Sequence, residues 1–119
     1  MAKDSELEQA VAALRREFAA ALPERLEALR AALNTLKSEV TRETLHAFHF
    51  PAHALQGTAG AYEAEELVPH VACLATLARR WLNSGVVPDA ERDAASRELD
   101  ALGVAIEHYR RRVAYPFRS

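Results

Sequence analysis

The sequence is short of several residue types on which common functions depend. Its 119 residues include one cysteine, four glycines and one tryptophan, and the formal net charge is −2 at pH 7. A single cysteine cannot form an internal disulfide, so we expect a reducing compartment, with Cys73 as a small core residue in an apolar run. The near-neutral charge provides no field for binding nucleic acid or an anionic membrane.

Long apolar runs are also missing. No stretch approaches the ~18 consecutive apolar residues of a membrane span. The first five residues are followed by charged residues, whereas a secretory signal would continue with an apolar segment. We therefore expect a cytoplasmic protein with no membrane partner, folded as one domain over residues 1–119 with its core at about 10–112.

What the sequence does contain is helical periodicity along nearly its whole length. Apolar residues recur every three or four positions, and no strand-like alternation of any length is present. The expected helices cover about residues 5–22, 23–40, 41–62, 64–84 and 88–113. The third contains Pro51, and we expect it to continue through that residue with a kink because its apolar stripe keeps phase. The sequence thus predicts an all-α protein, an antiparallel four-helix bundle with an additional N-terminal helix that packs across it or extends the second helix.

The third expected helix carries His53 beside two glycines, Gly57 and Gly60. Glycine costs about 1 kcal/mol relative to alanine inside a helix, so two of them within four positions need a reason. At about 100° per residue both glycines share the face of His53, and that face points away from the core stripe. The pattern indicates that something large must approach this imidazole closely.

The stretch from His53 to Tyr62, with the sequence His-x-Leu-Gln-Gly-Thr-Ala-Gly-Ala-Tyr, resembles the signature of histidine-containing phosphotransfer (HPt) domains. Residues 22–29 resemble the helix that precedes the phosphorylated helix in this family, and residues 65–67 resemble the start of the helix that follows it. The resemblance covers roughly residues 10–112. It implies a phosphocarrier in a multistep two-component phosphorelay.

On this resemblance His53 is the phosphoacceptor, and the partners are response-regulator receiver domains and a hybrid histidine kinase. The protein would not be an enzyme by itself, because the receiver supplies the aspartate and the magnesium, and it would need no cofactor or metal of its own. Gly57 and Gly60 would give the receiver's loops access, and apolar residues beside His53 on this helix and the preceding one would form the docking patch. The chemistry agrees, since a neutral imidazole is a competent nucleophile near pH 7 and phosphoryl transfer depends mainly on positioning and charge.

Two positions depart from the family pattern. Gln56 stands where the family often has lysine, and Glu63 stands where a glycine often follows the aromatic residue. Lysine would bring positive charge to the phosphoryl oxygens, whereas glutamine can only form hydrogen bonds; a protonated His49 would partly substitute. The candidate phosphoryl-binding or partner-binding residues are His49, Gln56, Gly57 and Gly60.

Other interpretations remain open. The chain would also suit an HPt-like adaptor that docks receiver or kinase domains without carrying phosphate. His46, His49 and His53 share a helix face, but a di-iron bundle needs two Glu-x-x-His motifs and further inward-facing glutamates, and only Glu43 with His46 forms one. Arg79 and the other arginines near helix ends are explained by helix capping and solvation, not by nucleic acid. A monomer is the default expectation, although the N-terminal helix would also support a dimer.

Overall fold

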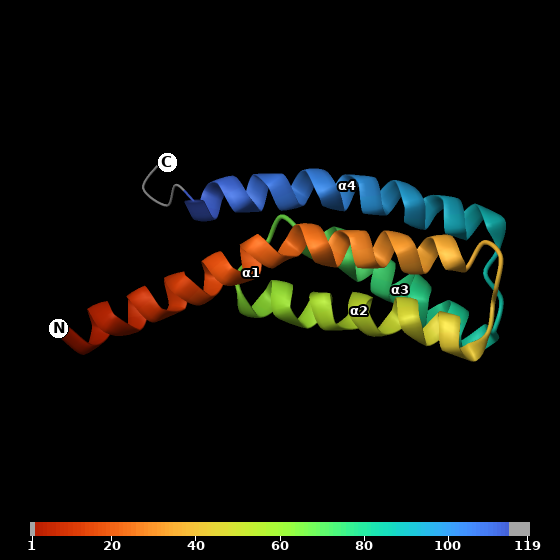
Figure 1. Cartoon of the computed structure of the whole chain (residues 1–119), viewed down its shortest axis with the longest axis horizontal. Coiled ribbons are helices and arrows are strands. Elements are labelled where there is room, and N and C mark those ends of the chain that lie inside the picture. Colours follow the sequence, from red (N-terminus) through yellow and green to blue (C-terminus); the bar gives the residue numbers. More distant parts are fainter. Residues whose placement is uncertain (1, 115–119) are drawn as a thin grey trace.

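The computed structural model describes residues 2–114, which form four helices. These are α1 (Ala2–Thr35), α2 (Arg42–Ala61), α3 (Val68–Ser84) and α4 (Asp89–Ala114). The helices pack antiparallel, and each contacts its two neighbours around the bundle (Figure 1). The predicted all-α, antiparallel four-helix bundle is confirmed. None of the helices between residues 2 and 114 is long and apolar enough to cross a lipid bilayer.

Residues 2–114 contain no separate additional N-terminal helix, because α1 continues without interruption through Pro23. Of the two predicted arrangements, the N-terminal segment extends the second helix and does not pack across the bundle. Proline at this position removes one backbone donor, the one that would reach the Ala19 carbonyl, and a helix tolerates that loss with a bend. The apolar residues on either side stay in phase, since Phe18, Leu22 and Leu26 are all buried. Burial on both sides of the proline holds the two predicted segments together as one helix. Figure 1 shows α1 bending where it joins the bundle.

The core is built from the apolar stripes of all four helices. Its largest fully buried side chains include Trp81, Tyr109 and Phe48, and no charged or polar residue of the described chain is buried with them. On α2 the buried residues are those of the predicted stripe: Leu45, Phe48, Ala52, Leu55 and Ala59. Cys73 is an exception to the prediction, because it is exposed on α3. The run around it is apolar throughout, but the helical period directs Val71 and Leu74 inward and Cys73 outward.

Local signals explain where α2 and α3 begin and end. Thr41 caps α2 through a reciprocal pair of hydrogen bonds with Thr44, and the helix runs through Pro51 as predicted. α3 starts at Val68, four residues later than the predicted start at residue 64, because the residues before it form a turn. Gly85 ends α3 in the left-handed conformation, with φ of 74°.

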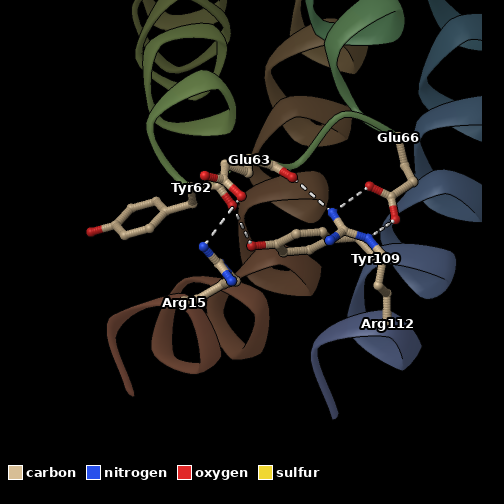
Figure 2. A network of polar contacts seen from close by, with 6 residues as sticks. All are labelled: Arg15, Tyr62, Glu63, Glu66, Tyr109 and Arg112. Carbon is tan, nitrogen blue, oxygen red and sulfur yellow. Dashed lines mark hydrogen bonds and ion pairs between the residues drawn. The ribbon is translucent and has the colours of Figure 1, made fainter. Parts of the chain in front are cut away.

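The turn between α2 and α3 is tied to α1 and α4 by polar contacts (Figure 2). Arg112 donates to the Glu63 carbonyl at 2.7 Å and to both carboxylate oxygens of Glu66 at 2.7 and 2.9 Å. Arg15 of α1 pairs with the Glu63 carboxylate at 3.5 Å. The Tyr109 hydroxyl donates to a backbone carbonyl of the same turn at 3.1 Å. These contacts fix the C-terminal end of α2, so both ends of the helix that carries His53 are anchored.

Glu63 is also the one non-glycine residue of the described chain with a positive φ, at 54°. This is the left-handed region, which glycine adopts at no steric cost and other residues adopt with strain. This chain therefore places a glutamate in a backbone conformation that glycine would adopt with less strain.

Candidate functional site

His53 lies on the solvent-facing side of α2, near the middle of the helix. Its side chain is exposed, while its neighbours Ala52 and Leu55 are buried in the core. Gln56, Gly57 and Gly60 are also exposed on this side. The structure therefore brings these predicted site residues together on one open helix face, with His49 half-buried at its edge.

The two glycines of this face are not required by the packing of the chain itself. A Cβ built at Gly57 or at Gly60 meets no heavy atom within 4 Å, and neither residue has a positive φ. Gly103 on α4 is different, because a Cβ there would lie 3.3 Å from Leu26 Cδ2 of α1. Gly103 allows two helices to approach each other, whereas Gly57 and Gly60 leave open space beside His53.

His49 is a titratable residue in direct contact with His53. The two rings stack with centroids 5.8 Å apart and an interplanar angle of 14°. Partial burial lowers the pKa of His49 below its usual 6.5, and the nearby His53, Arg79 and His46 lower it further. The lowered pKa makes the protonated form of His49 less populated than that of an unperturbed histidine, which reduces the positive charge that this ring can offer in place of a lysine.

Positive charge reaches this region from the neighbouring helices instead. Arg79 of α3 lies close enough to His49 to lower its pKa. On the other flank, Arg25 of α1 donates to the Thr58 hydroxyl of α2 at 3.5 Å. Local sequence patterns do not predict this position for either arginine, because helix capping is sufficient to explain Arg79 and Arg25 carries no local signal. Only the packing of α1 and α3 against α2 reveals that both guanidinium groups flank the helix that carries His53.

An apolar groove runs between α1 and α2 beside the histidine. Phe50 stands at its edge with 75% of its surface exposed, three residues before His53. The groove is lined by Arg25, Ala28, Leu29, Phe50, Pro51 and Ala54. The sequence predicted apolar residues of a docking patch on these two helices, and the structure places such residues next to each other there.

The structure also bears on the metal-site interpretation. Among residues 2–114, no group of three or more histidine, cysteine, aspartate or glutamate side chains is arranged to hold a metal ion. His46 and His53 are both exposed, and Glu43 beside them is exposed as well. The candidate site is therefore one exposed histidine, His53, on an open helix face, flanked by an apolar groove and two arginines.

Comparisons with models of known protein families, with curated proteins and with solved structures found no match. The function is therefore inferred from the residues of this chain and from their geometry.

Proposed function

We propose that this protein is an HPt-type phosphocarrier that shuttles a phosphoryl group between receiver-domain aspartates in a cytoplasmic multistep phosphorelay, with His53 as the phosphoacceptor. The observation that carries the proposal is the open space around His53. Two glycines on the face of a well-anchored helix have no role in packing, and they leave the imidazole accessible to a bulky partner. The HPt-like motif and the antiparallel four-helix bundle support the same function.

The reaction requires little chemistry from the chain itself. The unprotonated ring nitrogen of His53 attacks the phosphorus of an aspartyl phosphate, so a P–N bond forms while the P–O bond to the aspartate breaks and the carboxylate leaves. Transfer to a second receiver reverses these steps with a different aspartate. Since catalysis depends on in-line positioning and on charges in the partner's active site, this protein contributes the nucleophile and the docking surface.

Two features of the site support this role despite glutamine at position 56. Arg25 and Arg79 bring positive charge to both flanks of α2, where it would attract the negatively charged phosphoryl group and the acidic pocket of a receiver. The groove around Phe50 offers an apolar anchor three residues from the nucleophile. A hybrid histidine kinase and response regulators are the partners that fit this arrangement.

The decisive experiment measures phosphoryl transfer from a panel of phosphorylated receiver domains to this protein. We expect acid-labile, base-stable label on the wild-type protein and none on His53→Gln. His46→Gln is the matched control, because His46 is exposed on the same helix and should leave labelling intact.

A different outcome would favour the adaptor. If receivers bind the protein but never label it, and if His53→Gln binds them as tightly as the wild type, the phosphocarrier proposal fails.

A further inference from the structure

α1 is longer than the bundle that it belongs to. Its 34 residues span about 51 Å at 1.5 Å per residue, close to the 54 Å length of the whole molecule, whereas α2, α3 and α4 have 20, 17 and 26 residues. Figure 1 shows the N-terminal part of α1 extending past the ends of the other three helices. This projecting part lies on the N-terminal side of Phe18, which is the first residue of α1 that is buried in the core.

The projecting part carries an ordered apolar surface, which we call the N-terminal stripe: Leu7, Val11 and Leu14. These residues are 64%, 41% and 48% exposed. Their spacing of four and three residues, continued by Phe18 four residues later, is the a/d spacing of helices that pair in a coiled coil. The stripe leads directly into the core, because Phe18 stacks on Tyr62 with ring centroids 4.8 Å apart.

A stripe of this kind needs a covering surface. An isolated helical segment of fewer than about 15 residues is marginal in water, and helices in proteins gain most of their stability from packing an apolar face. Exposed apolar residues in a/d register therefore fit a helix that packs against a further helix.

The charges along the segment indicate which helix covers it. The N-terminal half carries Asp4, Glu6 and Glu8 against one lysine, Lys3, and the other end carries Arg15 and Arg16 against one glutamate, Glu17. The two ends therefore differ in the sign of their net charge. Two copies side by side in parallel would place acid against acid. Two antiparallel copies place the acidic half of each beside the arginines of the other, which is the favourable arrangement.

We propose that two copies of this protein associate through antiparallel pairing of their N-terminal stripes. Val11 of each copy then packs against Leu14 of the other, and Leu7 lies at the outer edge of the contact, because Phe18 is already covered by Tyr62 and Tyr109 of its own bundle. In this register Glu8 lies beside Arg15 of the second copy, and the two-fold symmetry forms that pair twice. Three apolar residues per copy make an interface well below the standard ~800 Å² per partner, so the dimer is weak and forms at high protein concentration.

This proposal does not rest on the phosphocarrier function. The N-terminal stripe is on α1, while His53 and its glycines are on the open face of α2. Disrupting the dimer should therefore leave labelling of His53 unchanged. Loss of labelling in His53→Gln should likewise leave the dimer unchanged.

The first test is analytical ultracentrifugation of the full chain at concentrations from about 10 µM to 1 mM. We expect the average mass to rise from 13.1 kDa towards twice that value. Leu14→Gln, which removes the same apolar contact from both copies, should raise the dissociation constant by at least about tenfold. Val104→Gln is the matched control, because Val104 is similarly exposed on α4 and should change nothing. A protein that stays monomeric throughout, or a Leu14→Gln variant that dimerises like the wild type, would overturn the proposal.

A charge exchange tests the antiparallel orientation. Glu8→Arg alone places two arginine pairs across the antiparallel interface, and Arg15→Glu alone places two glutamate pairs there, so each variant should associate less than the wild type. An equimolar mixture of the two variants should recover association, because every cross-pair is then complementary. Circular dichroism checks that Arg15→Glu stays folded, since Arg15 also pairs with Glu63. No recovery in the mixture of folded variants would rule out the antiparallel pairing.

Discussion

His49 stacks against His53 one turn earlier on α2, with ring centroids 5.8 Å apart. The contact places two titratable rings side by side, one half-buried and one exposed. Because partial burial and the neighbouring charges lower the pKa of His49, a proton added at mildly acidic pH costs more on this ring in the folded protein than in the unfolded chain. Protonation of His49, which lies against His53, therefore lowers the stability of the folded protein at acidic pH.

The lowered pKa of His49 predicts a pH dependence of stability. The unfolded chain binds a proton at this residue more readily than the folded protein, so the free energy of unfolding falls as pH drops below about 6.5. His49→Gln removes this contribution, and the variant should gain stability relative to the wild type between pH 7 and pH 5. Urea unfolding at a series of pH values measures the difference. A constant difference over that range would contradict the prediction.

Gly57 and Gly60 should lower the stability of the fold and, in return, leave His53 accessible to a receiver. Since a Cβ at either position meets nothing within 4 Å, replacement by alanine should stabilise the fold by up to about 1 kcal/mol each. The same substitutions should slow phosphoryl transfer from a receiver, because they fill the space beside His53. Gly103→Ala is the control, because its Cβ would crowd Leu26 and should bring no such gain. Alanine variants that are more stable and transfer at the wild-type rate would show that the glycines are not needed for access.

Phe50 should anchor a receiver at the groove between α1 and α2. Phe50→Ala should weaken receiver binding by roughly tenfold or more, as expected for an aromatic residue at an interface. Stability should change little because the side chain is 75% exposed. Val86→Ala, at a 57% exposed site in the α3–α4 connection, is the comparison. Titration calorimetry with a receiver measures both, and equal affinities would place the docking surface elsewhere.

Two substitutions of Glu63 should separate the free energy of its backbone strain from that of its surface ion pair with Arg15. Glu63→Gly removes a left-handed strain of about 1 kcal/mol and loses the pair with Arg15, which is worth about 0–1 kcal/mol at an exposed site. Glu63→Ala loses the same ion pair and keeps the strain. The glycine variant should therefore be about 1 kcal/mol more stable than the alanine variant in thermal or urea unfolding. Equal stabilities would mean that the turn relaxes without cost.

Much of the fold could be predicted from local patterns. The stripe from Leu45 to Ala59 has one apolar phase, so it predicts both a continuous helix through Pro51 and an inward face opposite His53. The end of α3 at Gly85 also follows from a local signal, because a glycine after the last turn favours the left-handed conformation there. Periodicity and helix-ending signals act over a few residues, and a sequence displays them directly.

Pro23 shows where local signals are insufficient. A proline is compatible with the first turn of a new helix and with the interior of a bent one, and the choice depends on whether the residues before it find a core. Phe18, which precedes the proline, packs in the core against Tyr62 and Tyr109. The residues on both sides of Pro23 therefore form one helix.

The amino-acid sequence by itself determined the apolar stripes, the exposed face of His53 and the glycines beside it, since each follows from residue spacing along a helix. It did not determine that the first two stripes belong to one helix. Only the tertiary structure decided that Arg25 and Arg79 flank that face, that the pKa of His49 is lowered and that Cys73 is exposed. Those properties depend on which helices pack together and on how much water their side chains retain. Burial and charge act across helices, between residues far apart in the sequence, so helix packing had to be known before they could be assigned.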